Sequence, residues 1–160
     1  MFSKFMKKSK VQVLAPLNGQ VIPLEQVPDP VFSQKMMGEG VAIMPTGGDV
    51  VAPIEGTIVL ISNTKHAIGI RTKDDTEVLI HVGLETVTLK GEGFTVLVNE
   101  GDSVSVGQKL MEVDWDLIKD KVPSIITPIV ITNSADRSVE YADAATSVAG
   151  ETLVMTVSPK

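Results

Sequence analysis

The stretch NTKHAIGIRTKDDTEVLIHV, residues 63–82, holds both histidines of the chain in what reads as one β-hairpin. Apolar residues recur along 64–71 and 77–82, and the polar run between these segments contains two adjacent aspartates, which favour turns. His66 lies in the first segment and His81 in the second. The stretch therefore predicts two antiparallel strands, each carrying one histidine.

The length of the turn decides whether the two histidines meet, because side chains alternate between the faces of a strand. A loop of two or four residues places Ile68 opposite His81, with His66 diagonal to His81 on the same face. Thr64, two residues before His66, then shares that face. A loop of three or five residues places the histidines on opposite faces. The sequence therefore permits a histidine pair without requiring one.

The remaining chain consists of short apolar segments rich in Val, Ile and Thr, separated by turn residues that include 13 Gly and 9 Pro. Their spacing of about ten residues is typical of an all-β sandwich or barrel. A helical pattern is clear only in DWDLIKDKV (114–122), and a further helical turn is expected near VFSQKMM (31–37). We therefore predict an all-β fold with a few short helical turns.

Two segments share a frame, LAPLNGQVI (14–22) and VAPIEGTIV (51–59), in which we expect Pro to enter a turn and Gly to supply a positive φ. A further segment, NEGDSVSVGQKLMEV (99–113), resembles the hammerhead turn of biotinyl- and lipoyl-type domains. Those domains carry their cofactor on a lysine at an exposed hairpin tip, and no matching tip is found here. A biotin- or lipoyl-type carrier is therefore a weaker alternative.

Composition restricts the function further. The 160 residues fit one domain, and 14 basic against 20 acidic side chains give a net charge of −6. This charge argues against nucleic acid as a partner but permits an acidic rim that meets a basic protein. The absence of cysteine excludes disulfides and thiolate metal sites. No apolar run is as long as a membrane span, so a cytoplasmic protein is expected.

The first ten residues, MFSKFMKKSK, are predicted to form a flexible basic tail ahead of a single domain at 11–160. One interpretation is a disordered, solubilising segment. The other is weak contact with an anionic membrane, because the Phe and Met side chains could share a helical face opposite the lysines.

A histidine pair has two chemistries open to it, beside the ordinary alternative of two unrelated surface or core residues. A neutral imidazole is nucleophilic near pH 7 and can accept a phosphoryl group on one nitrogen while its other nitrogen is held. His66 could then donate to the phosphoryl oxygens, with its tautomer fixed by Thr64. The pair could instead bind zinc, with further ligands from a carboxylate, water or a partner. No GxxxxGK[ST] loop for ATP is present, so phosphate would arrive on another phosphoprotein.

Several segments, in their order and spacing, resemble the glucose-type enzyme IIA domain of the bacterial sugar phosphotransferase system. The likeness extends from about residue 11 to the C-terminus. The segments are FSQKMMGEGVAIMPTG, VAPIEGTI, NTKHAIGI, LIHVGLETVTLKGEGF, EGDSVSVGQKLMEVD and TPIVITN. The resemblance implies an antiparallel β-sandwich of the barrel-sandwich type. It also implies that His81 is phosphorylated, that His66 supports it and that Thr64 hydrogen-bonds to His66.

The same resemblance implies that the domain takes its phosphoryl group from the phosphocarrier protein HPr and passes it to a IIB domain, with no required cofactor. The surface expected to dock these partners is an apolar face with an acidic rim, formed by Asp29, Val31, Phe32, Met36, Met37, Leu79, Glu85 and Val87. Ser62 and Leu79 stand where some relatives have Phe, which bears on partner preference. The runner-up function is a regulatory module whose apolar face binds transporters or kinases according to its phosphorylation state.

Overall fold

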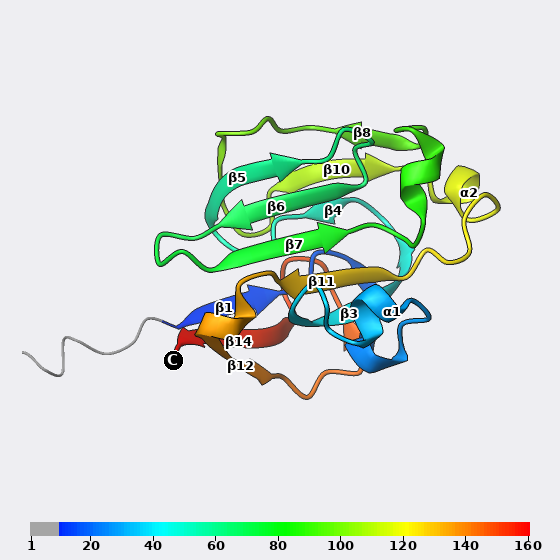
Figure 1. Cartoon of the computed structure of the whole chain (residues 1–160). Coiled ribbons are helices and arrows are strands. Elements are labelled where there is room, and N and C mark those ends of the chain that lie inside the picture. Colours follow the sequence, from blue (N-terminus) through cyan, green and yellow to red (C-terminus); the bar gives the residue numbers. More distant parts are fainter. Residues whose placement is uncertain (1–9) are drawn as a thin grey trace, which may run out of the picture.

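The computed structural model describes residues 10–160, which form mainly β-strands joined by short turns (Figure 1). The strands are β1 (Val11–Leu14), β2 (Asn18–Pro23), β3 (Glu39–Gly47), β4 (Val50–Val51), β5 (Gly56–Ile61), β6 (Ala67–Arg71), β7 (Glu77–His81), β8 (Phe94–Val96), β9 (Ser103–Val104), β10 (Lys109–Val113), β11 (Thr127–Ile131), β12 (Arg137–Tyr141), β13 (Thr146–Ser147) and β14 (Leu153–Pro159). The predicted tail lies outside the described residues, except for Lys10.

The strands form three antiparallel sheets. An eight-stranded sheet has the order β13-β2-β3-β11-β7-β6-β5-β9, and two three-stranded sheets have the orders β1-β14-β12 and β4-β10-β8. Figure 1 shows β7 and β6 side by side near the middle of the large sheet. The prediction of an all-β antiparallel sandwich is confirmed.

The helical elements are single turns, and the two α-turns begin at capping aspartates. They are η2 (Leu24–Gln26), α1 (Pro30–Ser33), η3 (Thr86–Leu89), α2 (Trp115–Ile118) and η4 (Ser134–Asp136). Asp29 accepts a hydrogen bond from the Val31 amide ahead of α1, and Asp114 accepts one from the Leu117 amide in α2. Both predicted helical turns are present, although α2 is shorter than the pattern in 114–122 suggested.

The main core lies between the large sheet and the two small sheets. Isoleucines on the inner faces of neighbouring strands are fully buried there, among them Ile68 and Ile70 of β6, Ile80 of β7 and Ile129 of β11. A second apolar cluster covers the outer face of the same strands. It consists of Leu24, Val27, Phe32, Ala42, Ala67, Leu79, Leu84, Ile126 and Val130, and it packs the segment containing η2 and α1 against the sheet. Strands β6 and β7 are therefore buried on both faces.

The register of the β6–β7 hairpin differs from the predicted one. The loop of two or four residues that would place Ile68 opposite His81 is not formed. Ala67 faces His81, because the loop contains three residues and Thr72 pairs with Thr76. Asp75 adopts a left-handed backbone with φ of 65°, which is typical of a three-residue loop that ends in a bulge. A regular strand in this register would send His66 to the opposite face from His81, but β6 begins only after His66.

The glycines of the repeated frame serve a different purpose from the predicted one. Neither Gly19 nor Gly56 has a positive φ. A Cβ at Gly19 would lie 2.1 Å from the Met44 carbonyl oxygen, and one at Gly56 would lie 2.4 Å from the Arg71 carbonyl oxygen. The prediction of positive φ is therefore wrong, and glycine is needed because a neighbouring strand approaches too closely for a side chain.

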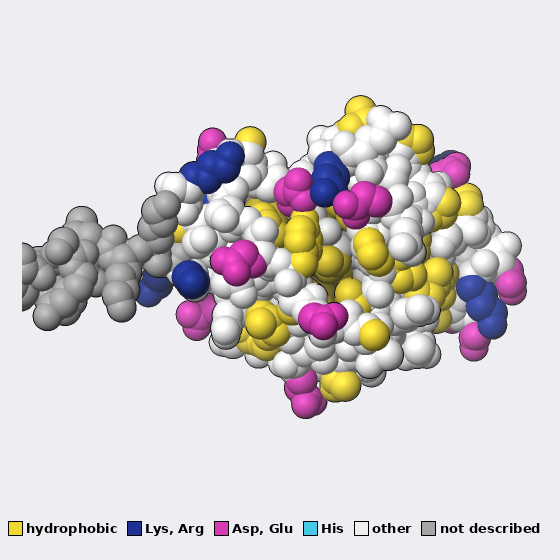
Figure 2. Space-filling view, turned by 90° about the horizontal axis from the view of Figure 1, so that it is seen from below, with side chains coloured by type: hydrophobic (Ala, Val, Ile, Leu, Met, Phe, Trp, Pro, Cys, Tyr) yellow, Lys and Arg dark blue, Asp and Glu magenta, His cyan; other side chains and the backbone are white. Residues whose placement is uncertain are grey.

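Within residues 10–160, no helix has the length and apolar character needed to cross a membrane. On the face seen from below in Figure 2, apolar side chains gather over the middle with acidic groups around them, and no histidine surface shows.

Candidate functional site

His81 is the last residue of β7, and its ring lies on the outer face of the large sheet. The ring Nδ1 is 2.8 Å from the carbonyl oxygen of Gly83, which the chain presents through a turn with φ of 74° at Gly83. The Phe32 ring packs against the His81 imidazole, with ring centroids 5.1 Å apart. Because a carbonyl only accepts, Nδ1 carries the proton and donates, and the lone pair of neutral His81 is on Nε2.

His66 is the last residue of the loop that joins β5 to β6. Ser62 closes this loop: its amide donates to the Ala67 carbonyl, and its hydroxyl accepts from the Ala67 amide. Lys65 adopts a left-handed backbone with φ of 64°, so the strand alternation does not extend back to His66. The His66 Nδ1 is 2.8 Å from the Thr64 hydroxyl oxygen. A short polar loop therefore aims His66 independently of the strand that follows.

The two imidazoles meet edge to face. Their ring centroids are 4.7 Å apart and their planes are inclined by 79°. The amide of Val82, next to His81, donates to the His66 carbonyl at 2.8 Å, which joins the two segments through the backbone. The structure thus brings Thr64, His66 and His81 together. The predicted diagonal contact between two regular strands is not the way in which the two histidines meet.

Burial disfavours the charged form of both rings. His66 is only 7 % exposed, and burial together with the neighbouring His81 lowers its pKa to about 4. Burial also lowers the pKa of His81, while the Gly83 carbonyl and the charge of Asp29 act in the opposite direction. Both imidazoles are therefore neutral at pH 7, the form in which histidine is nucleophilic.

The low pKa of His66 makes stability depend on pH in a defined window. The pKa is about 4 in the folded protein against an ordinary 6.5, so between these values the unfolded chain binds more protons. This contribution is fully present above pH 6.5 and is lost as the pH falls towards 4, by up to about 3 kcal/mol. Urea unfolding of wild type and His66→Gln across pH 4–7 is expected to show a shallower pH dependence for the variant. If the free energy of unfolding changed equally with pH in both proteins, His66 would not be the group responsible for this pH dependence.

The site supplies few ligands for a metal ion. Among the described residues, no group of three or more His, Cys, Asp or Glu side chains is placed to hold one. His66 and His81 together offer two imidazoles, whereas zinc sites in proteins take three or four protein ligands. Zinc at this pair therefore requires at least one further ligand from a bound partner, and this stays a prediction.

Comparison with known proteins identifies the family. Residues 11–137 match the family model described as phosphoenolpyruvate-dependent sugar phosphotransferase system, EIIA 1. The chain belongs to this EIIA family. Its members are components that carry a phosphoryl group during sugar uptake, so a pair of neutral, touching histidines is suited to the family's chemistry.

Similar proteins match most of this chain. The glucose-specific EIIA component of Bacillus anthracis is 51% identical over 100% of this chain and 98% of its own length. The glucose-specific EIICBA component of Staphylococcus carnosus is 54% identical over 80% of this chain, which corresponds to 19% of that longer protein. Among solved structures, glucose permease IIA from Mycoplasma capricolum superposes with a TM-score of 0.87 at 40% identity, covering 92% of this chain and 96% of that chain.

The predicted partner surface of this EIIA chain divides into an exposed and a buried part. Large apolar side chains that remain exposed include Val31, Met36, Met37 and Val87, and Met36 is 69% exposed. Of the two acidic positions, Glu85 is exposed and Asp29 is half-buried. Leu79 and Phe32 are 6% and 4% exposed, because the outer apolar cluster encloses them. These two side chains pack within the outer apolar cluster and offer little accessible surface to a partner.

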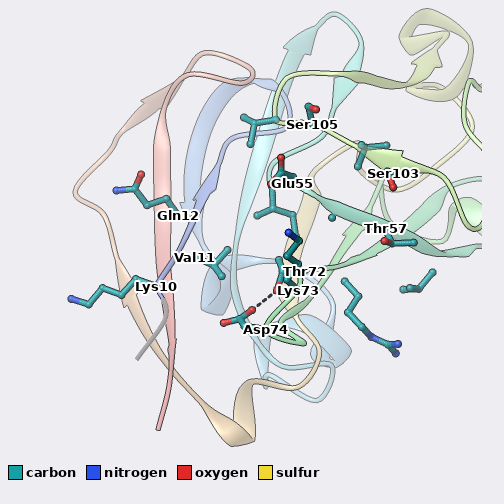
Figure 3. A pocket seen from close by; sticks show the side chains of 16 residues that line it. Lys10, Val11, Gln12, Glu55, Thr57, Thr72, Lys73, Asp74, Ser103 and Ser105 are labelled. Carbon is teal, nitrogen blue, oxygen red and sulfur yellow. Dashed lines mark hydrogen bonds between the residues drawn. The ribbon is translucent and has the colours of Figure 1, made fainter. Parts of the chain in front are cut away.

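A large cavity of the EIIA chain lies away from the histidine pair (Figure 3). It has a volume of about 870 Å³ and is lined by residues of β1, β5 and β9 and by the β6–β7 turn. Thr72 and Asp74, which Figure 3 shows joined by a hydrogen bond, mark that turn at the end of β6 away from His66. Neither His66 nor His81 lines this cavity.

Two features of the site were not predicted from the sequence. Gly83 supplies the carbonyl that fixes the His81 tautomer, and Phe32 packs on the His81 ring rather than standing free for a partner. A glycine two residues after a strand-ending histidine is a weak signal for the first contact. The second contact joins segments about fifty positions apart, and no local pattern reveals it.

Proposed function

We propose that His81 is the residue of this EIIA component that carries the phosphoryl group. In this proposal His81 accepts the group from the phosphocarrier protein HPr and gives it to a IIB domain during sugar uptake. The observation that carries the proposal is the pair of hydrogen bonds on the two touching rings: His81 Nδ1 to the Gly83 carbonyl, and His66 Nδ1 to the Thr64 hydroxyl, both at 2.8 Å.

The first hydrogen bond prepares His81 as the nucleophile. With Nδ1 donating to Gly83, the Nε2 lone pair of the neutral ring is free to attack phosphorus in line. As the N–P bond forms on Nε2, the donor's own N–P bond breaks and its electron pair returns to the donor nitrogen. No proton has to leave His81 during the step, because Nδ1 keeps its proton throughout.

The second hydrogen bond prepares His66 as a donor. When the Thr64 hydroxyl donates to Nδ1, the proton of neutral His66 is on Nε2, which can point at the phosphoryl oxygens. Phosphoryl transfer spreads charge over three oxygens in a loose transition state, so positioned hydrogen bonds supply most of the stabilisation. The two histidines thus have opposite tautomers and unequal roles.

The surroundings of the pair suit transfer between proteins. Val31, Met36, Met37 and Val87 offer apolar contact area, methionine adapts to more than one partner surface, and Asp29 and Glu85 favour a basic partner. The fusion of a similar EIIA segment into the EIICBA component of Staphylococcus carnosus supports transfer to a IIB domain. Because similar proteins are named glucose-specific, a IIB domain of a glucose permease is the first acceptor to test.

A phosphotransfer assay tests this function directly. The chain is incubated with enzyme I, HPr and labelled phosphoenolpyruvate, and label on the protein is followed with and without a glucose-type IIB domain. The proposal expects label that appears only when HPr is present and that then moves to IIB. Label that appears without HPr, or no label at all, would overturn it.

A second function, a regulatory binding module for transporters or kinases, is favoured by the exposure of Val31, Met36 and Val87. Phosphorylation would add up to two negative charges beside this apolar surface, so partner binding would depend on the phosphorylation state. Binding of candidate partners to phosphorylated and unphosphorylated protein, with and without zinc, distinguishes this function from relay alone. A cytoplasmic location stays a prediction.

A further inference from the structure

One buried threonine, Thr86, contacts the turn that follows His81. Thr86 begins η3 and is fully buried, at 0% exposure. Its hydroxyl donates to the Val82 carbonyl at 2.7 Å. The peptide group that this bond orients joins Val82 to Gly83, the residue whose own carbonyl accepts from the His81 Nδ1.

The methyl group of Thr86 contacts the same turn. A Cβ built on Gly83 would lie 2.7 Å from Thr86 Cγ2, so this methyl group packs directly over the Gly83 backbone. The turn is anchored at a third point, because the Leu84 amide donates to the Ser124 carbonyl at 2.9 Å. The Gly83 carbonyl therefore has little freedom to rotate away from His81.

Resting on the proposed role of His81, we propose that Thr86 is a positioning residue for phosphoryl transfer: its hydroxyl and methyl group hold the Gly83 carbonyl where it fixes the proton of His81 on Nδ1. Thr86 touches neither the reacting nitrogen nor a partner. It acts through Gly83, since the hydrogen bond at one imidazole nitrogen decides which tautomer is present. Without that bond, Nε2 of the ring becomes protonated in part of the molecules and is not nucleophilic.

The test compares Thr86→Val, which keeps the methyl group, with Thr86→Ser, which keeps the hydroxyl. Thr88→Val is the matched control, because Thr88 also donates to a backbone carbonyl, that of Glu85 at 2.8 Å, but is exposed and does not contact Gly83. Long-range ¹H–¹⁵N spectra of ¹⁵N-histidine-labelled protein report which His81 nitrogen carries the proton. Amide spectra check that each variant is folded.

We expect wild type and Thr88→Val to show His81 protonated on Nδ1, and Thr86→Val to show a mixture of tautomers, with Thr86→Ser in between. In Thr86→Val the maximal rate of phosphate uptake from HPr is expected to fall about three- to tenfold, the size expected from one lost hydrogen bond. The KM for HPr should stay unchanged, because the docking surface is untouched. Wild-type tautomer in Thr86→Val, or an equal change in Thr88→Val, would overturn the inference.

A second comparison keeps the inference testable if Thr86→Val does not fold. Gly83→Ala places a methyl group against Thr86 and also puts a side chain at a φ of 74°, so we expect it to perturb the His81 tautomer. The double variant Gly83→Ala/Thr86→Ser removes the clashing methyl group and should recover part of the wild-type tautomer. The strain from the φ of 74° is common to both variants, so any difference between their spectra reports the contact with the Thr86 methyl group. A double variant with a tautomer mixture further from wild type than that of Gly83→Ala would contradict the packing role of Thr86. If wild type accepts no phosphate, the proposed function fails, while the tautomer spectra still decide the role of Thr86.

Discussion

His81→Gln is expected to abolish phosphorylation by HPr and phosphoenolpyruvate. The substitution removes the only free imidazole lone pair at the site and replaces it with an amide, which is not a nucleophile at neutral pH. We expect labelling to fall to background, a loss on the order of 10⁶ in rate, as when an enzyme loses its nucleophile. Incorporation of labelled phosphate measures the effect, with the reaction quenched and the protein separated at alkaline pH, because the N–P bond of phosphohistidine hydrolyses in acid.

The control for this prediction is His66→Gln, because this substitution alters the other histidine of the pair and leaves the nucleophile His81 in place. Thermal unfolding of His81→Gln should show that the domain still folds, since the half-buried ring contributes little to the main core. Label on a folded His81→Gln protein would mean that the roles assigned to the two histidines are wrong.

His66→Gln is expected to accept phosphate but to pass it on poorly. His81 and its bond to Gly83 remain, so the nucleophile keeps its tautomer and label accumulates. Onward transfer loses the imidazole donor that faces the departing phosphoryl group. Removal of one such preorganised donor typically costs about 10²–10³ in rate. Single-turnover transfer from the isolated phosphoprotein to a IIB domain measures this step.

Graded variants separate this explanation from general disruption of the loop. Thr64→Val removes only the hydroxyl that orients His66, so it should slow onward transfer by less than His66→Gln does. Lys65→Gln changes the exposed residue between them and should behave as wild type. Equal loss in all three variants would show that loop structure, rather than the imidazole, accounts for the effect.

The strands could be predicted from the sequence because most of them repeat one simple pattern. Segments such as VQVL at 11–14 and KLMEV at 109–113 coincide with β1 and β10, since turn residues bound each apolar run. The register of the β6–β7 hairpin was not predictable, because TKDDT fits loops of two, three or four residues. Asp75 tolerates the left-handed backbone that the three-residue loop requires.

The contact between His66 and His81 does not follow from the alternation of side chains along a strand. Lys65 takes a left-handed backbone although it is not glycine, and this turns His66 out of the strand pattern and towards His81. The predicted docking role of Leu79 and Phe32 changes for a similar reason. Alternation places Leu79 on the outer face, but it cannot show that the segment from Leu24 to Phe32 covers that face.

The position of the phosphoryl group on the phosphorylated chain tests the central claim most directly. Long-range ¹H–¹⁵N spectra of the protein after reaction with HPr and phosphoenolpyruvate identify both the histidine and the ring nitrogen that carry phosphorus. The structure predicts phosphate on Nε2 of His81, with Nδ1 still protonated towards Gly83. Phosphate on His66, or on Nδ1 of His81, would contradict it.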